Sequence, residues 1–252
     1  MKKLKRILAL ALCIITVGCF SSCLNGNDSS SSSSTSDSSA VMRKVTKEEW
    51  EAAFDALNKT NNVTLYTEQL EVDDNLKPVQ SIKLTEKMAD GKYYQNLHEN
   101  IRYRYPPDSF EFNITGEVWA ARIDGVDYLY GKDPSSGKWI SRESENEMWY
   151  TLENRDFTLY KNSYEEMSYD ETMGIYRLEN KLVDADPIAY TVYYMTVEFR
   201  DGKIYRVANE ADVVHAGSVN GEAFCRIEGK VTVTMTFYDY GTTEIVLPEV
   251  EE

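Results

Sequence analysis

Runs of alternating apolar and polar residues, separated by turn dipeptides, make up most of the chain after residue 80. In residues 230–238, apolar side chains occupy every second position from Val231 to Phe237, and residues 81–88 and 189–199 show the same pattern. Strict alternation is typical of antiparallel strands with one buried face. The runs are separated by the turn dipeptides Asp90-Gly91, Asp124-Gly125, Ser136-Gly137, Asp201-Gly202 and Asn220-Gly221. The sequence therefore predicts a meander of antiparallel hairpins.

One helix is predicted before the first strand. Thr46 and Glu49 have the spacing of a capping box, in which each side chain satisfies a backbone N–H at the start of a helix. The apolar residues that follow form one stripe at helical spacing, and they are Trp50, Ala53, Phe54 and Leu57. We expect the helix to end near Asn58 and to bury this stripe.

A second helical region is predicted between Glu143 and Thr172, where the alternation is lost. Four apolar side chains recur there at helical spacing, and they are Phe157, Tyr160, Tyr164 and Met167. We expect one or two short helices, the first capped by Ser144. The fold class is thus mainly β (α+β): a curved antiparallel sheet, or half-barrel, that covers the N-terminal helix and the mid-chain helices.

The N-terminal residues have the organisation of a bacterial lipoprotein signal peptide. A basic segment precedes 11 mostly apolar residues, Ile7 to Val17, which is too short for a membrane span. Gly18 then precedes Cys19, as in a lipobox, where the resemblance implies cleavage and acylation of the cysteine. Cys23, after two serines, is the alternative acylation site. An ordinary secretory signal is the remaining interpretation.

Three segments follow from this interpretation. Residues 1–18 are the signal peptide, residues 19–44 are a lipidated Ser-rich tether, and residues 45–252 are the folded domain. The tether holds six consecutive serines and too few apolar residues to fold. Its lipid is the expected membrane anchor. The expected location is therefore the extracytoplasmic face of a bacterial cell membrane.

Charge and motif content argue against several functions. The net charge is −15, so the chain is a poor partner for nucleic acid. Two histidines exclude a three-histidine metal site, and the aspartates at 124, 127, 184 and 186 lack the pattern of a calcium loop. No nucleophile elbow, zinc-protease motif or phosphate-binding loop is present. We expect no enzyme activity, no cofactor and no metal.

The closing segment resembles that of a known family. Residues 236–243, Thr-Phe-Tyr-Asp-Tyr-Gly-Thr-Thr, and residues 245–248, Ile-Val-Leu-Pro, are similar to the last strand of the LolA-like half-barrels. These are the lipoprotein carriers and the LppX/LprG-type lipoproteins of mycobacteria. The start Val45-Thr46-Lys47-Glu48-Glu49-Trp50 is similar to the first helix of uncharacterised Gram-positive lipoproteins. The resemblance implies a curved sheet around helices with an apolar concavity that takes acyl chains.

Two functions are consistent with these observations. The first is binding or transport of a lipid or other hydrophobic ligand in a cavity whose candidate residues are Trp50, Phe54, Leu57, Tyr193, Met195 and Phe237. The alternative is an envelope binding or scaffold module with a closed core, which recognises glycan or protein. Trp119, Trp139 and Trp149 could stack on a carbohydrate, but Trp119 alternates with Ala121 and Ile123 and is predicted to face the core.

Overall fold

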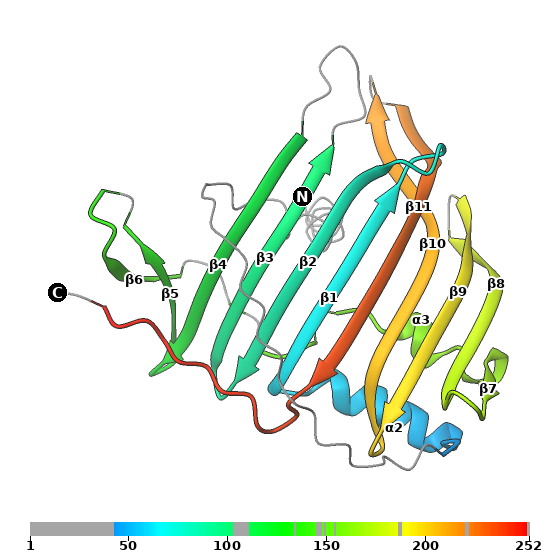
Figure 1. Ribbon diagram of the computed structural model, residues 1–252, viewed down its shortest axis with the longest axis horizontal. Helices are drawn as coiled ribbons and strands as arrows, with labels where there is room; N and C mark the ends of the chain where they lie inside the picture. The colour runs from blue at the N-terminus through cyan, green and yellow to red at the C-terminus, as the bar shows by residue number, and fades with distance from the viewer. Residues whose placement is uncertain are drawn as a thin grey trace.

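The computed structural model describes residues 43–102, 111–133, 135–144, 148, 150–153, 155–185, 188–219 and 222–250. These residues form one open antiparallel sheet with the strand order β6-β5-β4-β3-β2-β1-β11-β10-β9-β8-β7 (Figure 1). The predicted mainly β fold is confirmed. The signal peptide and residues 19–42 of the tether, including Cys19 and Cys23, lie outside the described residues.

Almost all neighbouring strands are also neighbours in sequence. The strands are β1 (Asn62–Val72), β2 (Pro78–Ala89), β3 (Lys92–Arg102), β4 (Glu111–Ile123), β5 (Val126–Lys132), β6 (Trp139–Glu143), β7 (Ser168–Asp170), β8 (Ile175–Ala185), β9 (Ile188–Arg200), β10 (Lys203–Val219) and β11 (Glu222–Tyr238). The exception is the pair of β1 with β11, which joins two meanders into one sheet.

The Asp-Gly dipeptides form the tight turns that the sequence predicts. Asp90 and Gly91 both have positive φ angles, 50° and 74°, between β2 and β3. The same two-residue conformation closes the turn at residues 124–125 and the turn at residues 201–202. This geometry matches the twist of the flanking strands, and glycine adopts it at little cost.

Helix α2 (Lys47–Asn58) begins with the predicted capping box. The Thr46 side chain accepts a hydrogen bond from the Glu49 N–H, and the Glu49 carboxylate accepts one from the Thr46 N–H. The mid-chain region forms a short helix, α3 (Thr158–Lys161), and one 3-10 turn, η1 (Tyr164–Glu166). Ser144, the predicted cap, directly follows β6, and its N–H donates to the Asp127 carbonyl at 2.7 Å. Residues 145–147, where the helix that it would cap begins, lie outside the described residues.

Both helices lie on one face of the sheet, behind β8–β11 in Figure 1. We call this the inner face and the opposite one the outer face. The largest apolar core lies between α2, α3 and the inner face of β1 and β8–β11. No helix among the described residues is long and apolar enough to span a membrane.

The segment after β11 crosses the outer face along the ends of β1 to β4 (Figure 1). Asn62 and Thr64 of β1 hold it by hydrogen bonds to Thr243, and the Tyr240 hydroxyl donates to the Ile204 carbonyl at 2.7 Å. Ile245 is 7% exposed. This segment, whose sequence carries the family resemblance, therefore contributes to the fold.

Candidate functional site

Five of the six predicted cavity residues form part of a filled core. Trp50 and Phe54 are fully buried, and Leu57 is 2% exposed. Met195 and Phe237 lie in the same cluster and are also buried. The Trp50 ring centroid lies 4.9 Å from that of Tyr176, and the Trp50 indole N–H donates to the Lys161 carbonyl at 3.0 Å. The helix is thus packed directly on the sheet.

The start of α2 is fixed to β8 by hydrogen bonds. The Tyr176 hydroxyl accepts from the Val45 N–H at 2.6 Å and donates to the Val45 carbonyl at 3.1 Å. Burial raises the pKa of Tyr176 to about 12, so the hydroxyl stays protonated and able to donate. The Tyr164 hydroxyl donates to the same carbonyl at 3.0 Å.

Tyr193 lies apart from the other five residues. The pairing of β9 with β10 shifts by one residue between Tyr194 and Val192, so the regular alternation is interrupted at Tyr193. Its hydroxyl donates to the Asp212 carboxylate at 2.8 Å, and the Lys230 ammonium lies 3.7 Å from its ring centroid. The hydrogen bond to Asp212 raises the pKa of Tyr193.

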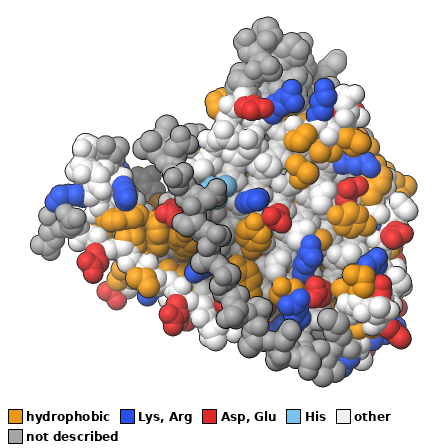
Figure 2. Space-filling model, in the orientation of Figure 1, with side chains coloured by type: hydrophobic (Ala, Val, Ile, Leu, Met, Phe, Trp, Pro, Cys, Tyr) orange, Lys and Arg blue, Asp and Glu red, His pale blue; other side chains and the backbone are white. Residues whose placement is uncertain are grey.

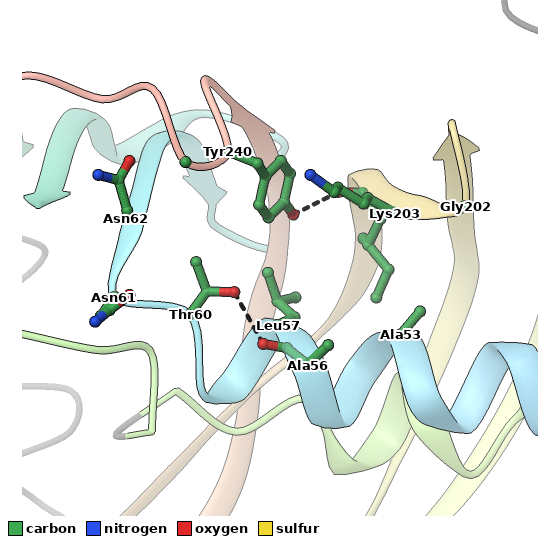
Figure 3. A pocket seen from close by; sticks show the side chains of 11 residues that line it. Ala53, Ala56, Leu57, Thr60, Asn61, Asn62, Gly202, Lys203 and Tyr240 are labelled. Carbon is green, nitrogen blue, oxygen red and sulfur yellow. Dashed lines mark hydrogen bonds between the residues drawn. The ribbon is translucent and has the colours of Figure 1, made fainter.

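A small cavity of about 300 Å³ lies beside the C-terminal end of α2 (Figure 3). Its apolar walls come from Ala53 and Leu57 of the helix together with Ile204 and Tyr240, and polar residues such as Asn61 line the rest. The Thr60 hydroxyl donates to the Ala56 carbonyl at 2.8 Å and is therefore satisfied within the protein. Its volume of about 300 Å³ is at the lower limit for a pocket that binds a small molecule.

A second apolar surface occupies the inner face of β2–β4. We call it the inner apolar surface and define it by Ile82, Leu84, Leu97 and Ile114. Leu84 of β2 is opposite Leu97 of β3. In the next row, Glu99 of β3 lies between Ile82 of β2 and Ile114 of β4. The first three are 3–6% exposed, yet α2 and α3 lie over the other half of the sheet (Figure 1). Helices α2 and α3 belong to the other cluster and therefore do not account for the burial of these side chains.

Glycine leaves space within this surface. Gly116 of β4 is opposite Leu97, and a Cβ atom built at Gly116 meets no atom within 4 Å. Its φ is not positive, so the backbone does not require glycine there. Gly131 of β5 has the same two properties. Glycine within a strand often marks a bulge, a bend or a close approach by a ligand or another chain, and the register of β3 with β4 has no bulge at Gly116.

Two buried polar atoms on this face, one in Glu99 and one in Thr67, have no hydrogen-bond partner in the part of the chain that the structure describes. The Glu99 side chain is 4% exposed, and its Oε1 accepts from the Gln80 amide, but Oε2 has no hydrogen-bond partner among the described residues. Burial raises the pKa of the Glu99 carboxyl. The buried hydroxyl of Thr67, on β1, is likewise unpaired within the described chain. Buried polar groups normally have a partner, so both could bind a polar part of a ligand.

A hydrogen-bonded ion pair separates this surface from the helix-covered core. Glu86 of β2 accepts from Arg155 at 2.5 Å and from the Tyr93 hydroxyl at 2.7 Å. Burial, followed by the nearby Glu86 carboxylate, raises the pKa of Tyr93 well above its ordinary value. Arg155 belongs to the segment that leads into α3, so this pair fastens that segment to the sheet.

A cluster of aromatic side chains lies on the outer face of β3–β6. Tyr94 and Trp139 each have a ring centroid 5.0 Å from that of Trp119. The prediction that Trp119 faces the core is wrong, because Trp119 pairs with Tyr94 and Tyr130 on the face opposite α2. Figure 2 shows hydrophobic side chains gathered over β4–β6 on this face. Trp149 lies outside the described residues.

Sequence reasoning missed Glu99 and Gly116, although both interrupt an alternating run. Glu99 occupies an inward position between Leu97 and Ile101, and Gly116 lies between Ile114 and Val118. A charged residue or a glycine at an inward position is the signal that could have identified them. The described residues contain no cluster of three or more metal-ligating side chains.

Comparisons with known proteins give a distant structural similarity. No family model and no curated protein matches the chain. A crystal structure of a DUF1329 family protein from Desulfovibrio piger shares 9% identity, with a TM-score of 0.20, over 77% of this chain and 90% of that one. A provisionally named outer membrane lipoprotein-sorting protein domain from Vibrio parahaemolyticus shares 8% identity over the same proportions, with a TM-score of 0.19. At these TM-scores the likeness carries no argument about function.

Proposed function

We propose that this protein binds a hydrophobic ligand on the inner face of β1–β5, outside the core that α2 fills. The observation that carries the proposal is the inner apolar surface, which α2 and α3 do not cover and which has open space at Gly116. Because Ile82, Leu84 and Leu97 are already buried, an acyl chain would gain apolar contact mainly with the partly exposed Ile114 and Val118 and at the open position of Gly116. Each Å² of apolar surface buried there contributes about 25 cal/mol. The binding site is therefore distinct from the predicted cavity around Trp50.

The proposal keeps the expected setting of the protein. The N-terminal sequence favours a lipid anchor at Cys19, with Cys23 as the alternative, on the extracytoplasmic face of a bacterial membrane. A domain on a flexible tether at that surface would have access to membrane lipids. We propose a binding or carrier role without catalysis.

The substitution Gly116→Leu tests the proposal directly. A leucine side chain would fill the open space beside Leu97, and the backbone conformation accepts it without strain. We expect the purified full-length protein to bind the neutral fluorescent probe N-phenyl-1-naphthylamine. We expect Gly116→Leu to weaken that binding at least tenfold with an unchanged melting temperature.

The matched control is Thr115→Leu, which introduces the same side chain at the adjacent, exposed position on the outer face of β4. We expect this variant to bind the probe as the wild type does. Equal probe binding by the wild type and Gly116→Leu would refute the site, as would an equal loss in both leucine variants.

A second candidate function is glycan binding by the outer-face aromatic cluster. Trp119 and Trp139 are half-buried and nearly perpendicular, at 86°, and the Tyr94 hydroxyl donates to Glu117 at 3.0 Å. Rings with polar neighbours suit the mixed surface of a sugar. Titration calorimetry with chitotriose tests this function. If the cluster binds glycan, the wild type should release or absorb heat on binding, and Trp119→Ala should not.

A further inference from the structure

We infer that the ligand of the inner apolar surface is a cationic amphiphile, whose protonated amine pairs with Glu99 while its hydrocarbon chain covers the neighbouring apolar residues. This inference rests on the proposed function and names its ligand class. It starts from a carboxylate oxygen that is buried and unpaired among the described residues.

The position of Glu99 makes an unpaired charge costly. Its opposite residues on the two neighbouring strands are Ile82 and Ile114, so apolar side chains flank the carboxyl. An uncompensated buried charge is strongly destabilising, whereas a paired and hydrogen-bonded one is tolerated. Gln80 satisfies Oε1, which leaves Oε2 as the acceptor for a donor from outside the described chain.

The charged residues on the same face indicate which charge the headgroup of the ligand carries. The other carboxylates on the inner face of β1 and β2 are Glu71 and Glu86, as their register places them beside Gln80 and Leu65. The basic groups described on this side of β1–β4 are each paired with a carboxylate: Arg155 with Glu86, and Arg122, at the far end of β4, with Asp127 at 2.7 Å. Neither cation pairs with Oε2 of Glu99, so the ionised Glu99 carboxylate would attract a protonated amine and repel an anionic headgroup.

The distribution of polar and apolar groups requires an amphiphile rather than a small amine. Leu84 and Leu97 lie one row from Glu99 along the strands, and Gly116 extends that row with open space. A hydrocarbon chain placed along this row would leave its head beside Glu99. The Thr67 hydroxyl, opposite Leu84 on β1, offers a second hydrogen-bonding group on the same face.

A series of 12-carbon amphiphiles tests the inference. Dodecylamine, dodecanol and dodecanoate share one chain and differ in headgroup charge. Each competes with N-phenyl-1-naphthylamine on the full-length protein at pH 7.5, the two ionic compounds below their critical micelle concentrations and dodecanol below its solubility limit. We expect dodecylamine to displace the probe at least tenfold more effectively than dodecanoate, with dodecanol between them. We expect Glu99→Gln to reduce the preference for the amine to less than threefold while binding of the neutral probe is kept.

Glu117→Gln is the matched control, because Glu117 is an exposed carboxylate on the outer face of β4. It should leave the preference unchanged. Equal displacement by all three compounds, or an amine preference that survives Glu99→Gln, would overturn the inference while leaving the hydrophobic site in place. Absence of probe binding in the wild type would instead refute the proposed function itself.

Discussion

Removing the Phe54 ring distinguishes a permanent core helix from a lid. Phe54 is fully buried, and its ring centroid lies 5.4 Å from that of Trp50 and 6.4 Å from those of Phe157 and Tyr160. Phe→Ala at such a site removes the transfer free energy of the ring and leaves a cavity, at a cost of about 3–5 kcal/mol. That cost is a large share of the roughly 5–15 kcal/mol that stabilises a typical domain.

The expected melting shift follows from the size of the domain. For a domain of roughly 150–250 residues, each kcal/mol lowers the melting temperature by about 2–4 °C, so Phe54→Ala should lower it by about 6–20 °C. Differential scanning calorimetry of the full-length protein measures this shift. Leu182→Ala on β8 is the control, because that side chain is 65% exposed and its removal should cost less than about 0.5 kcal/mol.

Ligand affinity provides the independent readout. The inner apolar surface lies on β2–β4, whereas Phe54 packs against α3 and against Phe157, the residue before it. Phe54→Ala should therefore leave the affinity for N-phenyl-1-naphthylamine unchanged at a temperature where the variant is folded. A small melting shift together with a large loss of affinity would refute this reasoning. The helix would then be a lid over the ligand.

Three further predictions follow from individual side chains. Because the pKa of Glu99 is raised, its protonated form stabilises the fold, and this contribution is present below about pH 4.3 and is lost as the pH rises through the folded-state pKa. Glu99→Gln should therefore raise the melting temperature at pH 7 and leave it unchanged at pH 3. The hydrogen bonds from Arg122 lower the pKa of Asp127 to about 2, so Asp127 stabilises the fold above about pH 3.9 and loses this effect as pH falls through about 2. Asp127→Asn should therefore cost about 2 kcal/mol at pH 7, and a chemical-denaturation series should show the difference narrowing toward pH 2. Labelling of cells with radioactive palmitate should be abolished by Cys19→Ser and kept by Cys23→Ser, and the reverse result would place the lipid on Cys23.

Local signals in the sequence determined the secondary structure well. The capping box at Thr46, the apolar stripe from Trp50 to Leu57 and the Asp-Gly turns each depend on residues close together in the chain, and the structure contains all of them. The family resemblance of residues 236–248 is a different case. This segment packs across the outer face, so its residues are explained by the fold and carry no information about a ligand.

The side on which a residue lies was harder to predict than the strand itself. Alternation assigns Trp119 and Ala121 to one face, but it does not say whether α2 packs there. Ala121 is 2% exposed although it lies on the outer face, so burial alone does not identify the inner one. Tyr193 shows a second difficulty, because the register shift depends on pairing between strands. Both properties require tertiary structure.

The dimensions of the elements explain why one half of the sheet lacks a helical cover. Helix α2 has 12 residues and is about 18 Å long, whereas eleven strands at about 4.8 Å spacing extend over about 48 Å. Even lying across the strands, α2 can cover about four of them, and its buried residues commit it to β8–β11 and β1. The apolar residues of β2–β4, of which Ile114 is partly exposed beside the open position at Gly116, therefore receive no covering layer from α2. A hydrocarbon chain at Gly116 would provide that layer, and an amine at Glu99 would pair with the buried carboxylate. Gly116→Leu and Glu99→Gln therefore test the same site, the first through the space for the chain and the second through the charge of the headgroup.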